Sequence, residues 1–192
     1  MTEIETAGNR KLDLTQRNFF TVPFWNVSKE VFEGRELKSA LVIGYNPELV
    51  NLVHRRDAGC KVTVIEQSED AIEDNKTILE AGETKIIIGR FPENLPEDVA
   101  DVDGVFGPYT LRHAKQKDRK EYILKVQKVL KTDGLACLSV HTLADSKIAQ
   151  QLRDEGFDFD EDPIGFLKGT LLVFDKNSYS LPSRTELTSN SR

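Results

Sequence analysis

Polar and small residues suited to binding a nucleoside-type ligand follow several short apolar runs of this sequence. Gly44 ends the run 39–43, and Glu66 ends the run 61–65, 22 residues after Gly44. A carboxylate can accept two hydrogen bonds from the vicinal hydroxyls of a ribose, and this spacing is typical of that role. We therefore predict that Glu66 binds a cofactor ribose. The alternative is a solvated residue at a strand end.

A glycine, an arginine and an aromatic residue follow the third apolar run, as Gly89, Arg90 and Phe91. Gly89 would let the backbone approach an adenine ring, and Phe91 would stack on that ring. The packing alternative is that Phe91 closes one end of the core.

The fourth apolar run leads into a loop that could hold a substrate, Gly107 to Tyr109, with His113 shortly after it. His113 is the best candidate for a general base, because an unperturbed histidine has a pKa near neutrality. The alternative is an ordinary surface histidine. His141, after the fifth run, is a weaker candidate, and we expect His54 to have no role beyond packing or exposure.

The elements that must position these residues alternate between two periodicities. We predict strands at 39–44, 61–65, 85–88, 103–106, 135–140, 157–159 and 170–174. Helices are predicted at 27–36, between Pro47 and Gly59, between Ser68 and Gly82, at 115–131 and at 146–155, with a turn at Asp133-Gly134. This order predicts a doubly wound, mostly parallel α/β sheet whose last two strands pair antiparallel. Ligands of such sheets bind beyond the carboxyl ends of the strands, where the candidate residues lie.

Length and composition fit one globular domain of 192 residues, with 39% hydrophobic and 30% charged residues. We place the domain at 37–176, after an N-terminal segment 1–36 and before a polar tail 177–192. The aromatic residues 19–25 either form a lid over the site or pack against the sheet or a partner chain.

The formal net charge of −6 argues against a general basic surface for nucleic acid, although it allows a local patch. No apolar run is long enough to cross a bilayer, so we expect no membrane partner. Cys60 and Cys137 have no metal-type spacing, and we read them as buried thiols of a cytoplasmic protein. We predict no metal site. The oligomeric state is left open, and a homo-oligomer is one possibility.

Four stretches resemble the class I S-adenosylmethionine-dependent methyltransferases: LVIGYNPEL, VTVIEQSEDAIEDN, VDGVFGPYTLRH and VLKTDGLACLSV. The resemblance covers about residues 37–175 and implies a Rossmann-like fold with a terminal antiparallel strand. It also implies S-adenosylmethionine as cofactor, with Glu66 on the ribose and the loop 107–109 facing the sulfonium and the substrate. The predicted cofactor residues are Gly44, Tyr45, Asn46, Glu66, Gln67, Gly89, Arg90, Phe91 and Gly107, and the residues expected beside the acceptor are Tyr109 and His113.

The sequence departs from the family pattern at two strand ends. The first loop keeps only Gly44 and continues Tyr45-Asn46-Pro47, and Gly89-Arg90 stands where the family often has an aspartate. We expect methyl transfer to a small-molecule acceptor. The alternatives are a methyltransferase-like binding or interaction module that has lost catalysis and, more weakly, a dehydrogenase or other nucleotide binder.

Overall fold

The computed structural model describes residues 14–73, 82–108, 110–141, 146–164 and 169–178. The helices are α1 Leu14–Val31, α2 Pro47–Arg56, α3 Glu69–Glu73, α4 Thr110–His113, a 3-10 helix Gln116–Asp118, α5 Arg119–Val129 and α6 Ser146–Asp154. The strands are β1 Ser39–Ile43, β2 Lys61–Glu66, β3 Thr84–Ile88, β4 Val102–Gly107, β5 Leu130–His141, β6 Asp160–Ile164 and β7 Gly169–Asp175.

All seven strands form one sheet in the order β3-β2-β1-β4-β5-β7-β6. The strands from β3 to β5 pair in parallel, and β7 pairs antiparallel with both β5 and β6. The predicted doubly wound, mostly parallel sheet with a terminal antiparallel strand is therefore confirmed. The chain leaves β1 toward β2 on one side and reaches β4 on the other, so the strand order reverses beside β1.

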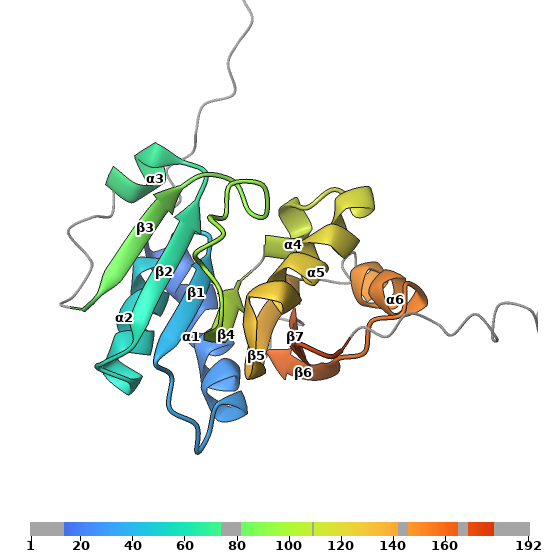
Figure 1. The fold of residues 1–192 in the computed structure, drawn as a ribbon, viewed down its shortest axis with the longest axis horizontal. Coiled ribbons are helices and arrows are strands. Elements are labelled where there is room, and N and C mark those ends of the chain that lie inside the picture. Colours follow the sequence, from blue (N-terminus) through green and yellow to red (C-terminus); the bar gives the residue numbers. More distant parts are fainter. Residues whose placement is uncertain (1–13, 74–81, 109, 142–145, 165–168, 179–192) are drawn as a thin grey trace, which may run out of the picture.

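Helices cover both faces of the sheet (Figure 1). Successive side chains of a strand point to opposite faces, so Leu41 and Ile65 belong to one core cluster while Val42 and Val64 belong to the other. The first cluster packs under α5, α6 and the connection 89–101, and the second packs under α1 and α2. Both faces are buried, which explains why the strands are continuous apolar runs in the sequence.

The N-terminal helix is longer and starts earlier than the sequence predicts. The helix predicted at 27–36 is confirmed only over residues 27–31, because α1 begins at Leu14, includes Pro23 and ends at Val31. Phe24 and Trp25 are buried, and the Trp25 ring lies 6.0 Å from that of Phe106 on β4. For these two residues the structure shows the packing alternative, and the rest of the predicted lid stays a prediction.

Three other predicted boundaries move. The helix predicted from residue 115 begins at Arg119, after the 3-10 helix. The predicted strand at 157–159 is wrong: the Phe157 amide bonds the Leu152 carbonyl at the end of α6, and β6 begins at Asp160. The Asp133-Gly134 turn is a bulge inside β5, because Val102 pairs with Leu130 and Gly104 already pairs with Leu135.

None of the helices in the described part of the chain combines the length and the apolar character that a membrane span requires.

Candidate cofactor site

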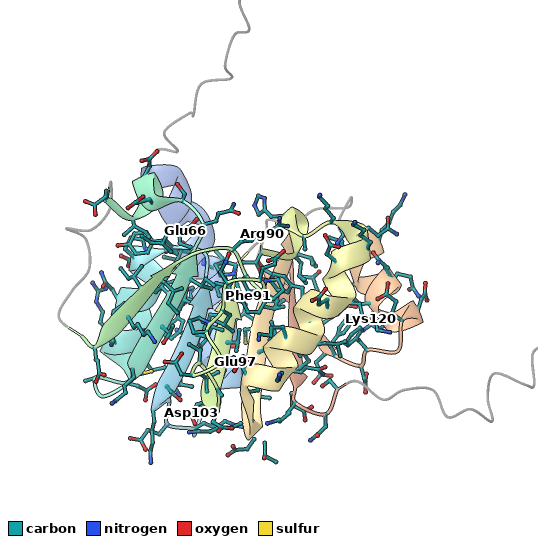
Figure 2. The ribbon with its side chains drawn as sticks, turned by 45° about the horizontal axis from the view of Figure 1, so that its top comes forward. Glu66, Arg90, Phe91, Glu97, Asp103 and Lys120 are labelled. Carbon is teal, nitrogen blue, oxygen red and sulfur yellow. The ribbon has the colours of Figure 1, made fainter. Side chains whose placement is uncertain are left out.

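Glu66 connects the loops that follow the first two strands. Its Oε2 atom accepts a hydrogen bond from the backbone amide of Tyr45 at 2.7 Å, and its Oε1 atom accepts one from that of Ser68 at 2.8 Å. The side chain is half-buried at the carboxyl end of β2, as Figure 2 shows. A carboxylate oxygen has two lone pairs, so each oxygen can still accept a bond from a ligand hydroxyl.

Gly44 leaves open space at the end of β1. Its φ of +87° lies in the left-handed region that favours glycine, and its amide donates to the Ile65 carbonyl at 2.9 Å. A Cβ atom built at Gly44 would meet no heavy atom within 4 Å. The backbone here is therefore accessible to a ligand that also reaches the neighbouring Glu66, and the two residues fit a nucleoside cofactor.

The rest of the first loop is occupied with structural contacts. Asn46 caps α2, since its Oδ1 atom accepts from the Leu49 amide at 3.0 Å, and its Nδ2 atom donates to the Thr21 Oγ1 atom at 2.7 Å. The Tyr45 side chain is only 6% exposed in the core under α1 and α2, and burial raises the pKa of its phenol. The Tyr45 side chain is therefore packed in the core, so only its backbone faces the site. The side chain of Asn46 is bonded to α1 and α2. Gln67, directly after β2, is exposed.

The loop after β3 closes on itself around Asn94. A Cβ atom at Gly89 would lie 2.5 Å from the Cβ atom of Asn94, and the Asn94 Oδ1 atom accepts from the Arg90 amide at 2.9 Å. The space that we expected Gly89 to leave for an adenine is filled by Asn94. The Arg90 side chain is exposed and lies 3.6 Å from the Glu93 carboxylate.

Phe91 lies in the core, as the packing alternative has it. Its ring is 7% exposed and meets the ring of Tyr122 edge-on, with 4.6 Å between centroids. An adenine could stack on Phe91 only after that ring had left Tyr122.

The acceptor side of the crevice is described only in part. Gly107 ends β4, where an added Cβ atom would meet Leu138 and Thr110 at 2.6 and 2.7 Å. The His113 side chain is exposed at the end of α4, which is the position of the surface alternative. Tyr109 and the side chain of His141 lie outside the described residues.

Three residues that make contacts in the site were missed by the sequence analysis: Ser68, Asn94 and Thr21. Ser68 is named in the sequence analysis only as the residue before a predicted helix, and its Oγ atom caps that helix by accepting from the Ala71 amide at 3.2 Å. Asn94 lies in a loop with two prolines, where a side chain that bonds nearby backbone is common. Thr21 gives no signal in sequence, because its partner Asn46 is 25 residues away.

No protein-family model matches this chain, and a search of curated proteins also finds no match. Solved structures do match. A chain from the Haloferax volcanii complex that holds the Trm112 methyltransferase activator has a TM-score of 0.65 at 13% identity, covering 83% of this chain and 93% of that one. A TehB-like SAM-dependent methyltransferase from Corynebacterium glutamicum has a TM-score of 0.58 at 11% identity, covering 84% and 98%.

A precorrin-6y C5,15-methyltransferase from Geobacter metallireducens has a TM-score of 0.57 at 18% identity, covering 88% of this chain and 92% of its own. At these identities the similarity concerns the fold. The chain has the Rossmann-like fold of class I methyltransferases.

Proposed function

We propose that this protein binds S-adenosylmethionine and transfers its methyl group to a small-molecule acceptor. The observation that carries the proposal is the pair formed by Gly44 and Glu66 at the ends of β1 and β2. Gly44 presents open backbone, and the carboxylate of Glu66 beside it keeps acceptor capacity for the ribose hydroxyls. Both stand next to the point where the strand order reverses.

When bound, the cofactor would supply an electrophilic methyl group on its sulfonium. The work left to the chain is to hold the acceptor close and aligned, which can account for much of the rate. An acceptor that must lose a proton needs a base, and His113 or Tyr109 would take that proton. Glu66 would hold the cofactor through its ribose hydroxyls.

The small-molecule acceptor is supported by charge and by the fold comparison. A chain of net charge −6 does not attract a polyanionic acceptor to its surface as a whole. The Geobacter neighbour with the same fold is named for precorrin-6y, which is a small molecule. We include the cytoplasm in the proposal, because Cys60 and Cys137 are both free and buried.

A methyltransferase-like binding module without catalysis is the second candidate. It is favoured by the contacts around the adenine side, where Asn94 occupies the space beside Gly89 and Phe91 is packed on Tyr122. Asn46 is also held by the α2 amide and by Thr21, so it has little freedom to follow a ligand.

Calorimetric titration with S-adenosylmethionine, S-adenosylhomocysteine and NAD in parallel tests the proposal. We expect micromolar binding of the first two ligands and none of NAD. Methyl transfer is then checked by release of S-adenosylhomocysteine in the presence of small-molecule acceptor pools. Binding without turnover on any pool would favour the module, and no binding of either sulfur ligand would refute the cofactor assignment.

A further inference from the structure

Two neighbouring segments of the chain carry large and opposite charges. Residues 91–103 hold five acidic residues and no Lys or Arg, whereas residues 115–131 hold seven Lys or Arg and two acidic residues. The first segment, here called the acidic connection, therefore has a net charge of −5. The second, here called the basic helix segment, includes α5 and has a net charge of +5, in a protein whose total is −6.

The two segments run side by side over the same face of the sheet. At one end the ring of Phe91 contacts that of Tyr122, and at the other end the Lys131 ammonium lies 2.6 Å from Asp103. Each segment runs from the carboxyl ends of the strands to their amino ends, since the acidic connection leaves β3 and enters β4, and α5 precedes β5. Figure 2 shows Phe91, Glu97 and Asp103 in sequence along this face, with Lys120 on α5 to one side.

Contacts within the chain neutralise only part of this charge. Lys131 pairs with Asp103, Lys85 with Asp98 and Arg90 with Glu93. Glu97, Lys117 and Lys128 are exposed, and together with Lys125 they form no ion pair with any other residue that the structure describes. Leu124, between these lysines on α5, keeps 36% of its surface exposed. The face therefore presents a negative stripe and a positive stripe that run next to each other.

We propose that this face binds a second copy of the same chain across a two-fold axis that runs between the two stripes. Such an axis, lying in the plane of contact, places the basic helix segment of each protomer over the acidic connection of the other. The contact is isologous, so each charge pair occurs twice. Leu124 supplies apolar surface within it, and the crevice at the carboxyl ends of the strands stays outside the contact.

A second copy explains the pattern better than a nucleic acid does. A phosphate backbone on α5 would gain attraction from the lysines, but it would also lie beside five carboxyl groups of the acidic connection. A second protomer brings charges of both signs in the arrangement that matches them. Because the pairs lie at the surface and each protomer has a net charge of −6, we expect a weak dimer that salt dissociates.

Sedimentation velocity of the full chain at high micromolar concentration tests the proposal. We expect a dimer at about 0.1 M salt and a monomer at about 1 M salt, where the screening length falls from about 10 Å to about 3 Å. One variant carries Lys125→Glu and Lys128→Glu, and the other carries Glu97→Lys and Asp98→Lys. Each variant alone should be monomeric, because the charge of its altered stripe falls to +1 or −1 and most of the attraction between the stripes is lost.

A one-to-one mixture of the two variants should restore dimer formation, because the unchanged acidic connection of one variant, at −5, then faces the unchanged basic helix segment of the other, at +5. This restoration also shows that both variants are folded. The matched control is Lys29→Glu with Lys61→Glu, which makes the same change in net charge away from the two stripes and should stay dimeric.

Three results would overturn the proposal: a wild-type monomer at low salt, a mixture that stays monomeric, or a control that loses the dimer. An oligouridine RNA serves as the competing probe. Its binding to a monomeric wild type, abolished by Lys125→Glu and Lys128→Glu, would instead identify the basic helix segment as a nucleic-acid site.

Discussion

The Glu66 carboxylate accepts a hydrogen bond from the backbone amide of Tyr45 at 2.7 Å, which links the loops at the ends of β1 and β2. With its second bond, to the Ser68 amide, the side chain fixes the loops after β1 and β2 relative to each other. The residue proposed to bind the ribose is thus also a structural contact between the two loops. A change at Glu66 should therefore affect both cofactor affinity and stability.

Glu66→Ala should weaken S-adenosylhomocysteine binding by about 1–3 kcal/mol, because a charged acceptor of hydrogen bonds is lost. Glu66→Gln should weaken it less, since its amide oxygen still accepts from one backbone amide or one hydroxyl. Titration calorimetry measures the affinities, and thermal unfolding measures the accompanying loss of stability. Glu83→Gln, an exposed carboxylate at the far end of β3, is the control. Unchanged affinity in Glu66→Ala would remove this residue from the site.

Asn46→Ala should destabilise the protein by about 1 kcal/mol or somewhat more, because it removes the cap of α2 and the bond to Thr21. Asn46→Asp keeps an acceptor for the Leu49 amide but loses the amide donor, so it should cost less. Urea unfolding of these variants, of Thr21→Val and of the double variants measures the coupling between the two residues. A coupling free energy of zero would show that the bond to Thr21 contributes nothing to stability.

Most of the strands were predictable because each is a short apolar run, and a helix pattern separates most of them from the next strand. The position of Glu66 was predictable for the same reason, since a strand end is where such a run stops. Long-range contacts are what the sequence could not give. Thr21 reaches Asn46 across 25 residues, through a tertiary contact that local patterns do not encode.

The errors at the boundaries have a similar origin. Phe157 and Phe159 alternate with polar residues as a strand would, yet both are buried and the Phe157 amide completes the end of α6. The apolar residues of α1 mix with Pro23 and polar residues and show no clear helical stripe, so the helix was placed too late. In both segments tertiary packing, and not local periodicity, decides where the element begins.

His54 should make the free energy of unfolding depend on pH below about pH 6.5. The side chain is 5% exposed, its Nε2 atom lies 2.9 Å from the Thr84 hydroxyl, and burial lowers its pKa. A histidine with a lowered folded-state pKa binds more protons when unfolded. Its contribution is therefore complete above the unfolded pKa of about 6.5 and is lost as the pH falls from there toward the folded value.

Urea unfolding at a series of pH values checks this prediction. The free energy of unfolding of the wild type should decrease as the pH falls below about 6.5, and His54→Gln should remove most of that decrease. His113→Gln, at an exposed histidine, is the matched control and should leave it in place. An identical pH dependence in His54→Gln and wild type would assign the effect to other groups.

Phe91→Leu separates packing from stacking on a cofactor. Because the ring is buried against Tyr122, the change should cost about 1–2 kcal/mol of stability, less than the 3–5 kcal/mol of a Phe to Ala change. Phe32→Leu is the matched control, since Phe32 is also buried and packs on Phe106 in the other core. Both variants should melt earlier, and both should bind S-adenosylhomocysteine as the wild type does. A loss of about 1–3 kcal/mol of affinity in Phe91→Leu alone would instead show that the ring leaves the core to stack on the adenine.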